Sequence, residues 1–207
     1  MSRIQELLKD IQQLQQRMAE EISREARDLG YRLHKGRVAF EQDVLDKHRQ
    51  MAKSIRQYLA EASWIGLLVS PIVYSLIIPV LIFDLFLSLY QTVCFTVFKI
   101  PKVRRSDYIV LDRHKLKYLN LIERFNCVYC GYANGFIAYA MEIGSRSEQY
   151  WCPIKHARSL AASHPHYPKF VAYGNAEEYV QRIDQLRSEL QTMEQQVQNI
   201  NDSRDES

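Results

Sequence analysis

Three of the chain's four cysteines and one histidine form two short groups with the composition of a metal site. "NCVYCGYANGF" places Cys127 and Cys130 three positions apart, and "WCPIKH" brings Cys152 and His156 about two dozen residues later. Paired thiolates from one short segment, with a thiolate and an imidazole from a second, make a donor set that suits tetrahedral zinc. The spacing therefore predicts a Cys3His site.

Four protein ligands would close this site to substrate, which is typical of a structural zinc ion. Iron in place of zinc, a redox dithiol at Cys127 and Cys130, and buried cysteines with no ligand stay open as alternatives. A cytoplasmic location keeps thiols reduced and so favours a bound metal over a structural disulfide.

The elements that must position these ligands belong to a module that we expect at residues 101–173. Asp112 suits the N-cap of a helix, "GYANG" reads as a turn, and Pro153 suits the first turn of a later helix. We therefore expect a short strand at 107–112 and three short helices, at 113–125, 136–151 and 153–163. In that arrangement all four ligands lie at helix ends.

An apolar segment at residues 63–100 precedes the module and predicts attachment to a membrane. From Trp64 up to its last lysine the segment carries one charged side chain, Asp84. One straight helix would be about 50 Å long, whereas the hydrocarbon core of a bilayer is about 30 Å thick. We therefore expect a membrane hairpin of two helices with a turn near residues 82–84, either crossing the bilayer or dipping into it and returning.

Basic residues flank the apolar segment on both sides, which predicts that both flanks and both termini are cytoplasmic. They are Lys47, Arg49, Lys53 and Arg56 before it, and Lys99, Lys102, Arg104 and Arg105 after it. Asp84 is either a functional carboxylate within the membrane or the N-cap of the second helix at the far interface.

Amphipathic helices are expected on either side, as an N-terminal arm at 1–62 and a C-terminal coiled coil at 174–200. The N-terminal stripe comprises Ile4, Leu7, Ile11, Leu14, Met18, Ile22, Ala26, Leu29 and Leu33, and the C-terminal one comprises Tyr179, Ile183, Leu186, Leu190, Met193, Val197 and Ile200. Their steps of three and four residues predict coiled-coil pairing, within one chain or with a second copy. The polar residues 201–207 are expected to be disordered.

Composition limits the remaining possibilities. A hydrophobic content of 47% is enough for a folded core, and a net charge of +3 is too small to indicate nucleic-acid binding. The sequence lacks a phosphate-binding glycine loop, a Ser-His-Asp order and a carboxylate pair, so it does not indicate an enzyme.

The stretch "SDYIVLDRHKLKYLNLIERFNCVYCGYANG", followed by "EQYWCPIKHA", resembles an uncharacterised family of bacterial membrane proteins. The resemblance covers about a third of the chain. It implies a bacterial setting, at the inner membrane, and a recurring cysteine and histidine unit that follows a membrane hairpin. Nothing about catalysis follows from this resemblance.

Taken together, these features predict a mainly α-helical fold with a membrane-embedded helical hairpin, a small metal-binding helical module and flanking coiled-coil helices. The expected function is that of a membrane-anchored scaffold or interaction protein with a structural zinc site. Two alternatives are a redox- or metal-sensing membrane protein that uses Cys127 and Cys130, and a small membrane metalloenzyme that acts on a lipid. Membrane lipids and a protein partner, or a second copy, are the expected partners.

Overall fold

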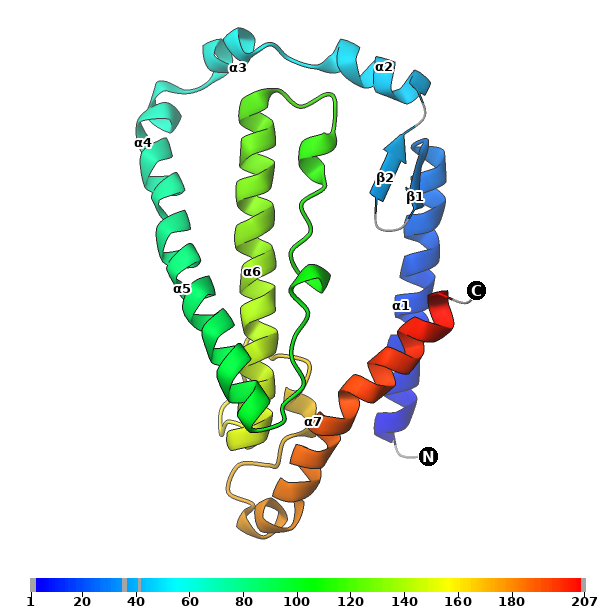
Figure 1. Cartoon of the computed structure of the whole chain (residues 1–207), viewed down its shortest axis with the longest axis vertical. Coiled ribbons are helices and arrows are strands. Elements are labelled where there is room, and N and C mark those ends of the chain that lie inside the picture. The colour runs from blue at the N-terminus through cyan, green and yellow to red at the C-terminus, as the bar shows by residue number, and fades with distance from the viewer. Residues whose placement is uncertain (1–2, 35–36, 41, 206–207) are drawn as a thin grey trace. The chain divides into compact units, whose positions relative to one another are not determined.

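The computed structural model describes residues 3–34, 37–40 and 42–205 (Figure 1). The described chain is mainly helical, as the sequence predicts. It divides into two compact units. Unit 1 comprises residues 1–63 and 111–128, and unit 2 comprises residues 64–110 and 129–207.

The described residues of the N-terminal part of unit 1 form α1 (Arg3–Asp28), a hairpin of β1 (Tyr31–His34) and β2 (Arg37–Phe40), α2 (Gln42–Met51) and α3 (Ile55–Glu61). The two strands are antiparallel. The expected continuation of the first helix through Leu33 is wrong, because Gly30 adopts a φ of 66° and its N–H bonds to the Arg27 carbonyl. This left-handed glycine ends α1 and redirects the chain into the hairpin.

The apolar segment forms one long helix, built from α4 (Trp64–Ser75), α5 (Ile77–Tyr90) and a π-helical turn, Gln91–Phe95. The hairpin expected near residues 82–84 is wrong, because α5 runs through these residues without a turn. Leu76, between α4 and α5, keeps helical backbone angles, with a φ of −61°. Pro79 lacks the N–H that would bond to the Ser75 carbonyl in a regular helix, which accounts for the break between α4 and α5 at Leu76.

Helix α6 (Leu121–Trp151) passes unbroken through the "GYANG" sequence, so the expected turn there is wrong. Asn120 and Glu123 start the helix with reciprocal side-chain to backbone hydrogen bonds of 2.9 and 3.0 Å, a capping box. Gly135 allows close packing rather than a turn, since a Cβ there would lie 2.7 Å from the Tyr108 carbonyl oxygen. Asn134 donates to the Cys130 carbonyl within the same helix.

The other elements expected in the module are also different. Residues 107–112 form no strand, and Asp112 precedes only a 3-10 turn, Arg113–Lys115. The helix expected at 153–163 is replaced by an irregular segment in which Ile154 pairs with Val171 in a single parallel bridge. Backbone bonds to Val171, rather than a helical repeat, therefore hold the start of this segment.

Helix α7 (Ala176–Asp205) confirms the predicted C-terminal helix and extends into the tail that we expected to be disordered. Leu186 and Leu190 are fully buried in unit 2. The Gln149 side chain, from α6, donates to the Leu186 carbonyl at 2.9 Å. This part of the heptad stripe therefore packs on its own unit. Residues 206–207 lie outside the described residues.

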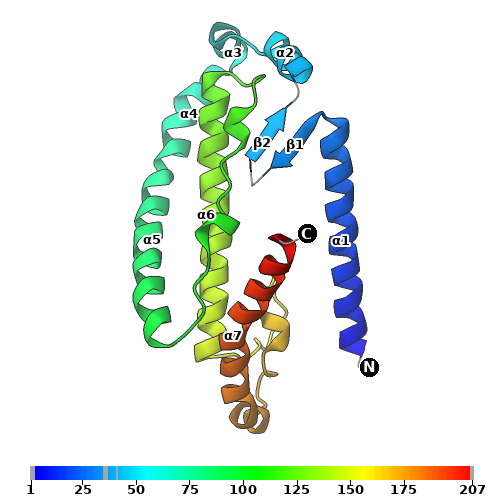
Figure 2. The same ribbon diagram turned by 45° about the vertical axis from the view of Figure 1, so that its right-hand side comes forward.

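Unit 2 has one hydrophobic core, where the end of the long apolar helix meets α6 and α7. Its buried members are Phe95, Ile100, Val103, Phe136, Tyr139, Ile143 and Leu190. Helices α5 and α6 lie side by side (Figures 1 and 2), with Phe83 5.3 Å from Phe136 between ring centroids. Further towards the C-terminal end of both helices, the Phe98 and Tyr150 rings are 5.6 Å apart, so the two helices run in the same direction.

Candidate functional site

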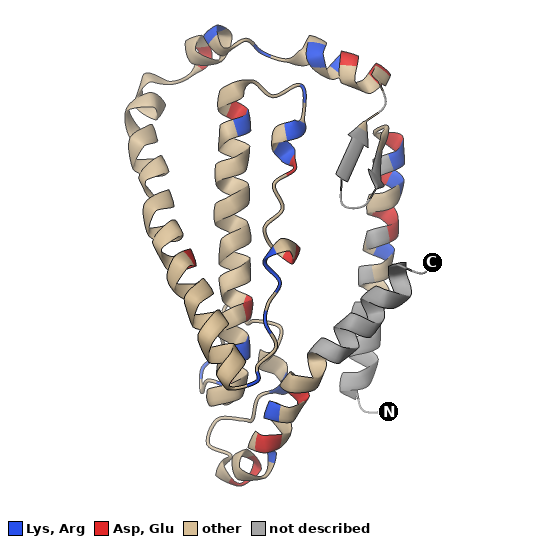
Figure 3. Cartoon of the chain, in the orientation of Figure 1, with Lys and Arg blue, Asp and Glu red and all other residues tan. Residues whose placement is uncertain are grey.

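The surface of the long apolar helix is the most unusual feature of unit 2. Among the described residues, Trp64–Phe95 is the one helix that is long and apolar enough to cross a membrane, and its most apolar stretch of 18 residues contains no buried residue. Figure 3 shows α4 and α5 without a basic residue and with one acidic position. The exposed apolar side chains are Trp64, Ile65, Leu67, Leu68, Val69, Ile72, Val73, Leu76, Ile78, Leu81, Ile82, Phe83, Leu85, Phe86, Leu89 and Val93. A patch of this extent indicates contact with lipid or protein.

Three polar side chains in the second half of the same helix face the protein. Asp84 and Gln91 are each only 7% exposed, and Ser88 is half-buried. A helix on the surface of a soluble protein shows the opposite arrangement, with its apolar stripe inside and its polar face outside. Polar residues turned towards protein and apolar residues turned outwards are typical of a helix that contacts lipid.

Asp84 is fully engaged by three side chains. Arg105 donates to both of its carboxylate oxygens, the Tyr132 hydroxyl donates to one of them, and Ser88 donates at 3.3 Å. The hydrogen bonds to Asp84 raise the pKa of Arg105 above its ordinary value, although burial acts in the opposite direction. The guanidinium also lies 5.8 Å from the Tyr132 ring centroid, within cation–π range.

A second set of hydrogen bonds lies about two turns after Asp84, towards the C-terminal end of the same helix. The Gln91 amide donates to the Tyr139 hydroxyl at 2.8 Å and accepts the Val103 N–H at 2.7 Å. Tyr90 and Ser147 hydroxyls lie 3.0 Å apart. We call this set and the Asp84 cluster the polar seam, comprising Asp84, Ser88, Tyr90, Gln91, Arg105, Tyr132, Tyr139 and Ser147. It joins α5 to α6 and to the segment after Pro101.

Hydroxyl groups elsewhere on the apolar helix are satisfied by the helix itself. Ser70 donates to the Leu67 carbonyl at 2.8 Å, and Ser75 donates to the Ile72 carbonyl at 2.7 Å. Thr92 bonds in the same way to a carbonyl one turn earlier. These hydroxyls need no water, which is the condition for a hydroxyl that faces hydrocarbon.

A separate buried cluster lies around Glu142, in the second half of α6. Its carboxylate accepts from Arg146 at 2.8 Å and lies 3.3 Å from His166 Nε2. His166 Nδ1 lies 2.5 Å from the Gln149 amide oxygen, so both ring nitrogens lie close to side-chain oxygen atoms. Burial alone would raise the pKa of Glu142, but the bonds from His166 and Arg146 lower it below its ordinary value.

The structure does not bring the four predicted metal ligands together. Cys127 and Cys130 lie on α6, Cys152 directly follows its last residue, and His156 is exposed in the irregular segment beyond. The unbroken helix separates Cys130 from Cys152 by about 33 Å at about 1.5 Å per residue. Within the described ranges, no group of three or more His, Cys, Asp or Glu side chains is placed to hold a metal ion. The zinc or iron site stays a prediction from spacing.

Sequence reasoning missed the polar seam and the Glu142 cluster, although a signal for the first existed. A lone acid in an apolar segment needs a cation, and Arg105 belongs to the basic run that follows that segment. No such signal exists for His166, because "SHPHYP" also suits a solvated loop. The structure shows His166 only 4% exposed.

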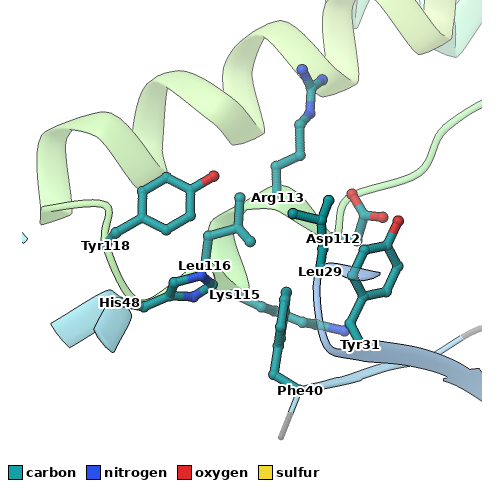
Figure 4. Close-up of a pocket in the computed structure, with 9 residues that line it drawn as sticks. All are labelled: Leu29, Tyr31, Phe40, His48, Asp112, Arg113, Lys115, Leu116 and Tyr118. Atoms are coloured by element: carbon teal, nitrogen blue, oxygen red, sulfur yellow. The ribbon is translucent and has the colours of Figure 1, made fainter. Parts of the chain in front are cut away.

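Unit 1 contains a pocket of about 340 Å³, and four of the nine side chains that line it carry rings (Figure 4). It is lined by Leu29, Tyr31, Phe40, His48, Asp112, Arg113, Lys115, Leu116 and Tyr118. Successive rings contact one another, with centroids 5.5 Å apart for Tyr31 and Phe40 and 4.9 Å apart for His48 and Tyr118. These contacts hold the β-hairpin and α2 against the segment 112–118 within unit 1.

Comparisons with protein-family models, with curated proteins and with solved structures found no match. The likeness to a bacterial membrane-protein family therefore stays a resemblance. Any function proposed for the chain depends on its own residues.

Proposed function

We propose that this chain is a membrane-anchored interaction protein, held at the bilayer by the helix Trp64–Phe95. Its inverted polarity carries the proposal, because apolar side chains cover the outside of this helix and Asp84 and Gln91 face the protein. Moving one large apolar side chain from water into lipid is favourable by about 1.5–3 kcal/mol. More than a dozen such side chains make stable anchoring the expected result.

The bacterial inner membrane, with both termini on the cytoplasmic side, completes the proposal for location. Basic residues on both flanks of the apolar segment support it, as does the family resemblance. The long helices α1 and α7 are the elements that we propose to meet partner proteins, since exposed apolar side chains remain on both. Leu14 and Met18 on α1, and Val180 on α7, are examples.

Alkaline extraction of bacterial membranes tests the anchor. Wild-type protein should stay with the membrane after carbonate treatment, whereas a variant with Leu85→Lys and Leu89→Lys should move substantially into the soluble fraction. Both leucines are exposed, so the lysines leave the contacts of unit 2 intact. Val180→Lys, on an exposed apolar position of α7, is the matched control and should stay with the membrane. Release of the wild type would overturn the proposal.

A further inference from the structure

We infer that the apolar helix lies along one leaflet of an anionic membrane, and that it does not cross the bilayer. This inference rests on the proposed anchor and names the surface that the anchor contacts. Three observations on unit 2 carry it: the length of the apolar face, the charged segment behind the same helix, and the basic residues near its end.

The apolar face is too long for a crossing. Exposed apolar side chains continue from Trp64 through Val93 to Val97, along the 32-residue helix and just beyond it. This helix is about 48 Å long, against a hydrocarbon core of about 30 Å. Fitting it across would need a tilt of about 50°, whereas transmembrane helices tilt by about 0–40°. An orientation along the surface leaves the whole face in contact with lipid.

Charged groups lie directly behind the second half of the helix. Arg105 bonds to Asp84 and the Val103 N–H bonds to Gln91, so the segment 101–107 follows the inner stripe of this half. The Arg104 side chain is 66% exposed there and that of Asp107 is 49% exposed. Hydrocarbon does not accommodate exposed charges or lipid-exposed irregular backbone.

The outer side of the same half has the opposite requirement. Leu85, Phe86, Leu89 and Val93 are all exposed on it. At one depth, therefore, the helix needs lipid on one side and water on the other. Only the boundary between hydrocarbon and water provides both, so this half lies in the membrane surface.

Exposed basic side chains near the end of the helix indicate that this end lies at a membrane surface with anionic lipids. Lys99, Lys102 and Arg104 are exposed just after the apolar face. Near a membrane surface each such charge adds about 1 kcal/mol of attraction to anionic headgroups. Trp64, at the other end, is an exposed residue of the type enriched at the interface. Both ends of the helix therefore carry residues that suit a headgroup layer, as an orientation along one leaflet requires.

Depth-dependent fluorescence quenching tests this orientation. A background with Trp64→Phe and Trp151→Phe receives one tryptophan at a time, by Leu68→Trp, Ile82→Trp or Val93→Trp. These outward positions span about 38 Å of helix. The full chain is reconstituted in phosphatidylethanolamine and phosphatidylglycerol vesicles whose lipids carry bromine near the headgroup or near the chain end.

A helix along the surface places all three tryptophans at one shallow depth, so each should be quenched more by bromine near the headgroup. A crossing helix would place residue 82 deepest, and stronger quenching there by bromine near the chain end overturns the inference. Val180→Trp in the same background is the control and should not be quenched. Absence of quenching at all three positions would instead contradict the membrane anchor itself.

A second measurement uses the unsubstituted chain and so does not depend on those variants folding. Reporter tags at the N-terminus and at the C-terminus should be digested together by protease added to one side of the membrane. Protection of one tag while the other is digested would show a single crossing and would overturn the inference. Carbonate resistance would persist in that case, so the anchor and its orientation are tested separately.

Discussion

At the scale of single residues, Asp84 shows how a charge can lie on an otherwise apolar helix. Its carboxylate is covered by α6 and meets Arg105 and Tyr132, so the group is compensated on the protein side and hidden from the outer face. A buried ion pair of this kind adds little net stability, but removal of one partner leaves the other charge uncompensated.

Arg105→Gln should therefore lower the free energy of unfolding by about 1–3 kcal/mol, less than for a fully buried pair because the Arg105 side chain is partly exposed. Unfolding in detergent micelles, followed by circular dichroism, measures the effect. Arg104→Gln is the matched control, since Arg104 pairs with Asp107 at the surface. Equal losses in the two variants would refute a special role for the Asp84 pair.

The lowered pKa of Glu142 predicts a dependence of stability on pH. A carboxyl group whose pKa is lower in the folded state stabilises the fold above its unfolded pKa, near pH 4.5, and this contribution disappears as pH falls through the lowered value. Glu142→Gln should lack this contribution, so the difference in stability between wild type and variant should narrow as the pH falls below 4.5. Glu177 is exposed, so the Glu177→Gln variant should be about as stable as the wild type at every pH measured.

At the scale of elements, the continuity of α6 decides both the packing of unit 2 and the fate of the predicted metal site. Gly131 is buried and Gly135 lies against the backbone of Tyr108, so small residues serve helix packing here. The same continuity holds Cys130 and Cys152 at distant positions along one helix.

Two glycines of α6 should respond oppositely to alanine. Gly135→Ala places a Cβ 2.7 Å from the Tyr108 carbonyl oxygen and 3.0 Å from the Ile109 Cα, so it should destabilise the chain by about 1–3 kcal/mol. Gly144→Ala meets nothing within 4 Å and should stabilise it by about 0.5–1 kcal/mol. Thermal unfolding compares the two, and a loss at Gly144 equal to that at Gly135 would contradict the packing described.

Thiol labelling separates the observed helix from a Cys3His site. With α6 intact, Cys130 and Cys152 are both exposed and act independently. Their labelling rates should not change with a chelator, and Cys152→Ser should leave the rate at Cys130 unchanged. Faster labelling of both cysteines after addition of a chelator, or one metal ion bound per chain, would support the zinc prediction. Either result would require a break in α6.

At the scale of the whole molecule, the chain divides into two compact units. Helix α7 belongs to unit 2, where its Leu186 and Leu190 side chains are buried. Two members of the heptad stripe that predicts a coiled coil are therefore buried in unit 2, and the coiled coil itself stays a prediction. Exposed apolar side chains remain on α7 outside this stripe, with Val180 74% exposed.

Leu190→Asp should consequently unfold unit 2, because the new carboxylate would be desolvated among apolar side chains without a partner. Loss of protease resistance in the region from α6 to α7 measures this. Val180→Asp should leave resistance unchanged. If Leu190→Asp instead alters only the oligomeric state, with resistance intact, the coiled-coil interpretation of this stripe stands.

The sequence alone determined the helical class, the apolar segment and the C-terminal helix, because local periodicity and hydropathy suffice for these. Only the tertiary structure decided that residues 82–84 and "GYANG" continue helices. Glycine and asparagine favour turns locally, yet the bond of Asn134 to the Cys130 carbonyl and the contact of Gly135 with Tyr108 stabilise the helix here. The same holds for Arg105, whose partner lies 21 positions earlier and is reached only through packing. Contacts between residues distant in the sequence therefore decide which side of the apolar helix carries its buried polar groups.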